Sequence, residues 1–569
     1  MGTIVKFKPT IDYYYSRGLD RYEHDDYIGA IECYREAYRM TENGAGEEFR
    51  SLLEVEMACA YRNLHLVREA QLMFYKALCD DNPDAAFDSV VGLIEVFGTS
   101  GSNNEALKYY MDMASKRGYS RELDYLDAAA QFFAQRDYHV EPSSDKHMVD
   151  LGKKLTEAGQ YDFARQLLEV IPPDSSVYGE ACMALAALHN KGTGDYEKAL
   201  DYLQKAGDKV PTAEYLIHSA LAQYKLGQKE ALDETVRDIA SIDTDDVGVL
   251  SRLIHTVALL GMDDLVISFG KKLALRSPQR APMLCYAIAL ANRGELREAR
   301  KILVSLQALF PFDVAVRVFS SLIGSQTAAT NFSLLGDLPD GVENEMLGAL
   351  NGALADCGSD RQMLRNKLRE PQYRVPVLMV FQAGSDNSKR ILADIVADIP
   401  FYERYIRDCL MDPGFSDADK RILLSVALKR FRRRPVYLTC RDVCRPLYGK
   451  PPVKTGARWK EVYCMAYGAV ALFGFENFER EFDAAFGKLK DSLSEEEDIN
   501  ETAAAALLAH RLKFVPPLSD DECCIELFEA DREKYFRYKH ITAYGGHKKR
   551  PYEVSAKPKS VKKKTHEEK

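Results

Sequence analysis

The stretch GDYEKALDYLQKAGDKVP, residues 194–211, joins a turn-forming glycine to an amphipathic helix and ends on a proline. Similar stretches begin at Gly159, Gly227, Gly261 and Gly294. From the first to the last of these five glycines the spacings are 35, 33, 34 and 33 residues. A fixed period of this length indicates a repeated structural unit and not a single surface helix.

Small and large residues recur at fixed offsets within the copies, and helix packing explains why. Small residues let the two helices of a unit approach closely, while large residues fill the layer between units. We expect a proline near the end of a unit to stop its second helix, because proline lacks an N–H and crowds the preceding turn. The residues that carry this packing signature are Gly18, Ala30, Ala37, Ala58, Ala70, Ala77, Ala199, Ala206, Ala299, Pro211 and Pro311.

Over roughly residues 11–315 the period and these positions resemble the tetratricopeptide repeat. The resemblance implies an all-α fold, an α-solenoid in which helix pairs stack into a right-handed superhelix. It also implies a concave groove, lined by the first helix of each pair, that binds a protein or peptide. By position the groove residues are Tyr15, Tyr22, Arg62, Asn63, Tyr224 and Lys225. The alternative is that the tyrosines pack between units.

One subtype of this family binds the C-terminal carboxylate of chaperones through Lys and Asn at the fifth and ninth positions of the first helix. Those positions hold Tyr15 and Leu19 in the first unit, and Val55 and Cys59 in the second. We therefore expect no binding of chaperone tails.

Composition and turn signals divide the chain into eight segments. The second half is again helical but resembles no family that its residues identify, and it contains a candidate β-hairpin. The segments are a lead-in at 1–10, N-terminal repeats at 11–117, further repeats at 118–323, a linker or irregular connection at 324–341, a helical repeat-like region at 342–428, a basic segment with the candidate hairpin at 429–460, C-terminal helices at 461–543 and a disordered basic tail at 544–569.

The basic segment is the strongest candidate for contact with nucleic acid. It holds eleven Lys and Arg against one Asp, although the chain as a whole carries a net charge of −10. Arginines can bind phosphates and aromatic rings can stack on bases. The alternative, which we favour, is that the arginines pair with acidic helices of the same chain. The candidate contacts are Arg430, Arg432, Arg433, Arg434, Arg441, Arg445 and Trp459.

Motifs of catalysis and metal binding are absent from the sequence. It contains no GxxxxGK[ST], no GxGxxG after a strand, no HExxH and no GxSxG. Cys440, Cys444, Cys523 and Cys524 lack the spacing of zinc sites, and buried thiols are the favoured interpretation. We expect no enzymatic activity, no cofactor and no metal.

The cellular setting follows from hydrophobicity and cysteine usage. No apolar run reaches 18 residues, so no membrane span is expected. The twelve cysteines are scattered through helical stretches, which is typical of reduced thiols in a cytoplasmic protein. The sequence thus predicts a cytoplasmic, non-enzymatic scaffold that binds an unidentified protein or peptide. The alternative is a nucleic-acid-associated protein that uses residues 429–460 and the tail, with the repeats as an adaptor.

Overall fold

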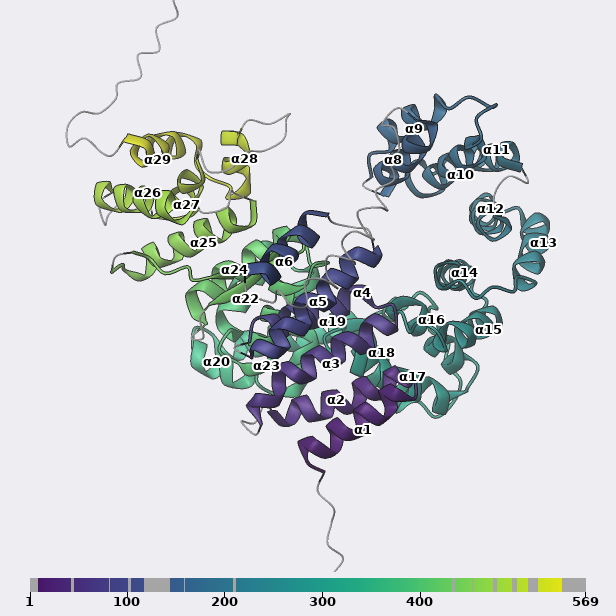
Figure 1. Ribbon diagram of the computed structural model, residues 1–569, viewed down its shortest axis with the longest axis horizontal. Coiled ribbons are helices and arrows are strands. Elements are labelled where there is room, and N and C mark those ends of the chain that lie inside the picture. The colour runs from purple at the N-terminus through teal and green to yellow at the C-terminus, as the bar shows by residue number, and fades with distance from the viewer. Residues whose placement is uncertain are drawn as a thin grey trace, which may run out of the picture. The chain divides into compact units, whose positions relative to one another are not determined.

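The chain folds almost entirely into helices that pack as consecutive pairs (Figure 1). The computed structural model describes residues 9–41, 46–80, 82–100, 104–116, 144–157, 159–207, 211–431, 435–452, 454–473, 478–493, 499–509 and 520–544. The predicted lead-in, most of the first repeat after residue 117 and the predicted tail lie largely outside these residues.

The repeat region is built from helix pairs in which an A helix is followed by an antiparallel B helix. Each A helix packs on its own B helix, and most of the B helices pack on the A helix that follows, as expected for stacked repeats. The pairs are α1 (Ile11–Glu23) with α2 (Tyr27–Thr41), α3 (Arg50–Asn63) with α4 (Val67–Leu78), α5 (Pro83–Ser100) with α6 (Asn104–Lys116), α8 (Asp145–Glu157) with α9 (Tyr161–Glu169), α10 (Tyr178–Leu188) with α11 (Tyr196–Ala206), α12 (Thr212–Leu226) with α13 (Lys229–Ala240), α14 (Val247–Leu259) with α15 (Asp263–Ala274), and α16 (Arg280–Asn292) with α17 (Leu296–Leu309).

The remaining elements follow the repeat region and are mainly helical, which confirms the predicted all-α fold with a small hairpin. They are α18 (Val314–Ser325), α19 (Val342–Cys357), α20 (Arg361–Lys367), α21 (Arg374–Ala383), α22 (Asp386–Val396), α23 (Pro400–Met411), α24 (Asp417–Arg430), β1 (Val436–Cys440), β2 (Val443–Leu447), α25 (Ala457–Phe473), α26 (Glu479–Ser492), α27 (Glu501–Leu508), α28 (Asp520–Leu527) and α29 (Arg532–Tyr544), with short helical turns at Glu47–Phe49, His189–Thr193 and Pro371–Tyr373.

The glycines that align in the sequence form the turn between the A helix and the B helix. All five have a left-handed backbone, with φ between 70° and 82°. In the turns at Gly159, Gly227, Gly261 and Gly294, the glycine N–H bonds the carbonyl three residues back, and the next N–H bonds the carbonyl five residues before it. This pair of bonds is the Schellman motif, which favours glycine because a left-handed residue strains a side chain.

The first two units build the same turn without glycine. Asp25 and His65 occupy the equivalent place two residues before the B helix, with φ of 59° and 58°. Their hydrogen bonds follow the same pattern, with Asp26 N–H to Arg21 O at 2.9 Å and Leu66 N–H to Tyr61 O at 2.9 Å. The turn is therefore a property of the unit, and glycine is the residue that adopts it with the least backbone strain.

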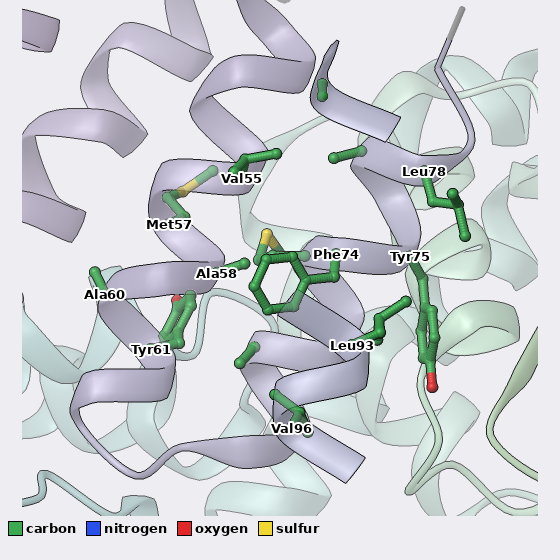
Figure 2. Close-up of a cluster of buried hydrophobic side chains, with 14 of the residues drawn as sticks. Val55, Met57, Ala58, Ala60, Tyr61, Phe74, Tyr75, Leu78, Leu93 and Val96 are labelled. Carbon is green, nitrogen blue, oxygen red and sulfur yellow. The ribbon is translucent and has the colours of Figure 1, made fainter. Parts of the chain in front are cut away.

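Packing inside each unit follows the small-to-large pattern of the sequence. Gly18 faces the ring of Tyr34, which would overlap a Cβ at that position, and a Cβ on Gly152 would lie 2.6 Å from Leu168 Cγ. Figure 2 shows the second unit, where Phe74 lies among Ala58 of α3 and the side chains of α5. The predicted small residues of the signature are all buried.

The two signature prolines do not end a helix directly. α11 stops at Ala206, five residues before the exposed Pro211, which instead precedes the first turn of α12. α17 stops at Leu309, and the carbonyl of Pro311 accepts a bond from the Arg317 side chain at the start of α18. Both prolines therefore belong to the entry of the following A helix, where the missing N–H leaves no helical bond unmade.

Distant parts of the chain close onto the first two units. The Tyr61 hydroxyl donates to the carbonyl of Leu309 at 2.8 Å, and Ser277 donates to the carbonyl of Leu64 at 2.6 Å. α17 packs on α2, and α23 packs on α4. At the second contact Lys76 lies 3.1 Å from Asp408. The first units are thus held by long-range contacts in addition to their neighbours.

The predicted linker at 324–341 is an irregular connection that packs tightly on the repeats. Asn292 holds it in place, since its side-chain oxygen accepts from the Phe332 N–H at 2.9 Å and its amide donates to the Phe332 carbonyl at 3.0 Å. Leu334 is buried in the core around α16. This segment does not separate two compact units.

The chain passes between two compact units at three later points, one in the predicted helical region 342–428 and two inside the predicted basic segment. One unit comprises Met1–Ser416 with Tyr437–Pro446, and the other comprises Asp417–Val436 with Leu447–Lys569. Arg441 and Asp442 connect β1 and β2 with φ of 49° and 63°. Positive φ at both central positions is the signature of a tight two-residue hairpin turn. The predicted hairpin is confirmed, although β2 begins two residues earlier than RPLYG.

Candidate functional site

The A helices α1, α3 and α5 present a continuous stripe of partly exposed polar side chains. α3 packs on α5, and the residues concerned recur at intervals of three and four, so they share one side of each helix. We call this surface the A-helix face. It consists of Tyr15, Tyr22, Glu56, Cys59, Arg62, Asn63, Asp84, Asp88 and Glu95.

Hydrogen bonds and an ion pair connect this face from helix to helix. The Tyr15 hydroxyl donates to Glu56 at 3.3 Å, and the Asn63 amide donates to the Tyr22 hydroxyl at 2.8 Å. Arg62 pairs with Glu95. The structure thus brings together four predicted groove residues on one surface. They also contact one another, so the two interpretations of the tyrosines, as surface and as packing between units, both describe part of their environment.

The carboxylates of the face carry more negative charge than its cations neutralise. Arg62 pairs with Glu95, whereas Glu56 and Asp88 form no ion pair within the described part of the chain. Burial raises the pKa of Glu56, and the nearby Asp88 raises it further. Burial and the charge of Asp84 raise the pKa of Asp88. Burial next to Glu56 raises the pKa of Tyr15 to about 12.

Beneath the face lies the hydroxyl of Tyr34, which the sequence indicated only as packing. Tyr34 has no exposed surface, and its hydroxyl has no hydrogen-bond partner among the described residues. Its ring lies against Gly18, with its centroid 6.2 Å from that of Tyr15. Burial raises the pKa of Tyr34, and Glu56 is the charge that raises it most. A tyrosine where several later units have leucine, at Leu168, Leu203 and Leu303, was the available signal.

The other two predicted groove residues lie elsewhere. Tyr224 and Lys225 are exposed at the end of α12, whose packing neighbours are α10, α11, α13 and α14. The Lys225 ammonium lies 5.8 Å from the ring centre of Tyr224. They belong to a separate stretch of A-helix surface and do not extend the cluster of α1, α3 and α5.

A second polar cluster, which sequence analysis did not identify, surrounds a π-helical turn at His189–Thr193. His189 donates to or accepts from Thr193 at 2.8 Å and stacks on Tyr202. The Asn190 amide donates to the carbonyl of His218 at 3.0 Å. Burial lowers the pKa of both histidines. The cluster holds neutral imidazoles inside the repeat.

The predicted nucleic-acid residues that the structure describes are divided between the two compact units. Arg441 and Arg445 belong to the first compact unit, and Arg430 and Trp459 to the second. Trp459 is wrong as a stacking residue, because it is buried with its ring edge-on to Phe486 at 5.7 Å. The remaining predicted contacts, Arg432, Arg433 and Arg434, lie outside the described residues.

The described residues contain no group of three or more His, Cys, Asp or Glu side chains placed to hold a metal ion. Cys444 lies beside Cys79, with the sulfurs 3.8 Å apart, and both are part of the core of the first units. An apolar cavity of about 160 Å³ lies between α2, α16 and α17. Ligand pockets usually exceed about 300 Å³, so this cavity is too small for most of them.

Neither the family models nor the curated proteins that were searched contain a match to this chain. Among the described helices, none combines the length and the apolar character needed to cross a membrane.

Proposed function

We propose that this chain is a non-enzymatic scaffold that binds a protein or peptide on the A-helix face of its repeats. One observation carries the proposal. The A helices of consecutive pairs pack directly on one another, from α3 with α5 and from α8 through α10, α12, α14 and α16 to α18. Their outward residues therefore form continuous rigid surfaces, and a rigid surface loses little conformational entropy when it binds.

The resemblance of the repeats to tetratricopeptide repeats supports the same proposal, since recognition of proteins is the usual role of that architecture. Tyr15, Tyr22 and Arg62 also suit an interface, because tyrosine and arginine dominate the binding energy of many protein complexes. The favoured site is the face of α1, α3 and α5.

Capture of partners from a native lysate tests this proposal. The bait is the full chain with an affinity tag, compared with a variant that carries Tyr22→Ala and Arg62→Ala. A matched control carries Lys229→Ala and Glu230→Ala on the exposed surface of the B helix α13. We expect wild type and control to retain the same discrete protein after nuclease treatment, and the Tyr22/Arg62 variant to lose it.

Two results would contradict the proposal. Retention of the partner by the Tyr22/Arg62 variant would show that the A-helix face is not the interface. Loss of every partner after nuclease treatment would favour the alternative that the protein associates with nucleic acid. Circular dichroism of each variant confirms that the helices remain folded.

A further inference from the structure

The chemistry of the A-helix face identifies the kind of group that it can bind. This step rests on the proposed function, because it names the partner chemistry of the same surface. Three observations bear on it: the uncompensated carboxylates, the buried hydroxyl of Tyr34, and the tyrosine rings at the rim.

The first observation is an excess of negative charge in a half-buried place. Glu56 accepts one hydrogen bond, from Tyr15, and a carboxylate can accept about four. Asp84 and Asp88 follow on α5, and the cation of Arg62 is already paired with Glu95. The face therefore attracts cations and repels anions.

The second observation is independent of charge. A buried hydroxyl without a hydrogen-bond partner lowers stability, so most proteins avoid one. The Tyr34 hydroxyl reaches the space under the face because Gly18 has no side chain to block the ring. The groups that influence its pKa are Glu56, Tyr15, Tyr22 and Cys59, which are all members of the face. The hydroxyl therefore lies near these groups and is unsatisfied there.

The third observation concerns the rim. The Tyr15 hydroxyl bonds Glu56, and the charge of Glu56 also raises the pKa of Tyr22, so both tyrosines lie near this carboxylate. An aromatic ring attracts a cation held against it. The bond from Tyr15 to Glu56 is long at 3.3 Å, and it is the one hydrogen bond described for the Tyr15 side chain. Access of a ligand to the Tyr34 hydroxyl therefore requires this bond to break and the Tyr15 ring to move.

We propose that the A-helix face of α1, α3 and α5 receives a cationic side chain, arginine or lysine, from a basic segment of a protein partner. Glu56 and the Tyr34 hydroxyl accept hydrogen bonds from this side chain, and Tyr15 and Tyr22 enclose its stem. Asp84 and Asp88 favour further basic residues on the side of α5.

Fluorescence anisotropy with synthetic peptides tests this directly. The probes are labelled hexa-arginine, hexa-lysine and hexa-citrulline, the last of which keeps the shape of arginine but has no charge. The protein is the full chain. We expect wild type to bind the two cationic probes and not hexa-citrulline, with affinity that weakens as salt rises.

Two matched substitutions separate a specific site from attraction by the net charge of −10. Glu56→Gln and Glu230→Gln each remove one negative charge, and Glu230 lies exposed on α13. Since a hydrogen bond to a charged group is worth about 1.5–3 kcal/mol, we expect Glu56→Gln to weaken binding about tenfold. We expect Glu230→Gln to change it less than twofold. Equal effects of both would overturn the proposal.

Tyr34→Phe tests the buried hydroxyl without breaking any described hydrogen bond. Because the hydroxyl is unsatisfied in the free protein, its removal leaves the melting temperature unchanged or raises it. We expect the same variant to bind hexa-arginine about tenfold more weakly, because the lost hydrogen bond is one to a charged group. Unchanged affinity would overturn the assignment of Tyr34.

The two proposals fail in different ways. If Tyr22→Ala with Arg62→Ala loses a captured protein while Glu56→Gln leaves peptide binding unchanged, the scaffold function stands and the cationic partner is wrong. If Glu56→Gln weakens peptide binding while no protein is captured at the face, the cation site stands and the scaffold function is wrong.

Discussion

The first three helix pairs, α1–α6, differ from the pairs between α8 and α14 in the contacts that stabilise them. Both regions stack by the same rule, with A helix against B helix. The first region also receives α17 on α2 and α23 on α4, together with residues 437–446 against Tyr75 and Tyr110. The extensive helix contacts of α8–α14 are all with sequence neighbours.

Because of this difference, a destabilising substitution should have different effects on stability in the two regions. In a stack held by neighbours, stability is a sum of local terms, and one unit can open without the others. A region closed by distant segments loses its long-range contacts together when it opens. A substitution in α1–α6 should therefore lower the stability of helices far along the chain. A substitution in α8–α14 should affect the stability of its neighbouring helices alone.

The largest expected effect is from Lys76→Met in the closed region. Lys76 lies against Asp408 and near the buried Glu54, so its removal takes away the cation that pairs with Asp408 and leaves Glu54 with Arg50. Breaking a buried pair costs about 3–5 kcal/mol. We expect faster amide hydrogen exchange in both α4 and α23, while α10–α13 are unchanged. Lys198→Met, which removes an exposed pair with Asp195, is the control and should change exchange little.

A smaller effect is expected where helices approach over glycine. Gly18→Ala forces a methyl group against the ring of Tyr34, and Gly152→Ala forces one against Leu168. Overpacking costs about 1–3 kcal/mol. Both side chains are buried, but the rigid aromatic ring can adjust less than the flexible leucine side chain, so Gly18→Ala should cost more. Exchange rates of α1–α2 and α8–α9 measure the two costs, and a larger loss from Gly152→Ala would contradict this reasoning.

The A-to-B turns give opposite results in the two regions. His65→Gly should stabilise its turn by about 0.5–1 kcal/mol, because glycine adopts the left-handed backbone without strain. Gly227→Ala should destabilise its turn by about 1 kcal/mol, although a Cβ there has open space around it. Exchange protection of α3–α4 and α12–α13 is the measurement. Changes of the same sign in both turns would show that packing, and not φ, decides.

The smallest effect concerns pH. Burial holds the pKa of His189 and His218 below 6.5, so both are neutral in the folded repeat and gain protons more readily when it unfolds. Their contribution to stability is complete above pH 6.5 and is lost as pH falls from there through the lower folded values. We expect α10–α12 to exchange faster, relative to an unstructured peptide, at pH 5.5 than at pH 7.5. The variant His189→Gln with His218→Gln should lose this dependence.

In α1–α6 burial raises the pKa of carboxyl groups, whereas in α10–α12 it lowers the pKa of the two histidines. The two regions therefore depend on pH in opposite directions. Glu54 and Glu56 have a raised pKa, so they contribute most to stability in their protonated form, below their unfolded value of about 4.5. That contribution falls as pH rises through the folded values. We therefore expect acid to destabilise α10–α12, whereas protonation of Glu54 and Glu56 should not destabilise α3.

How far the sequence predicts this molecule depends on the range of the interaction. Repeat length, helix pairing and the buried small residues are local properties, and they are read from the spacing of glycine and alanine. The turns at Asp25 and His65 escape an alignment on glycine, because their backbone is fixed by hydrogen bonds that any residue can form at some strain.

The candidate site is predictable in part for the same reason. Tyr15, Tyr22, Arg62 and Asn63 lie on one helix face by periodicity, and the structure joins them. The unsatisfied hydroxyl of Tyr34 depends on which groups lie opposite it, which no local pattern contains. Trp459 shows the reverse error, since an aromatic residue within a basic run is buried by helices that follow it.

The contact between Lys76 and Asp408 also sets an order of events during synthesis. The two residues are 332 positions apart. At about 5–20 residues per second, the ribosome needs roughly 20–60 seconds to deliver the partner. During that interval the ammonium of Lys76 and the hydroxyls of Tyr75 and Tyr110 lack the groups that satisfy them in the finished protein. The nascent N-terminal repeats are therefore less tightly packed until these residues have been synthesised. A chaperone would help them most during this interval.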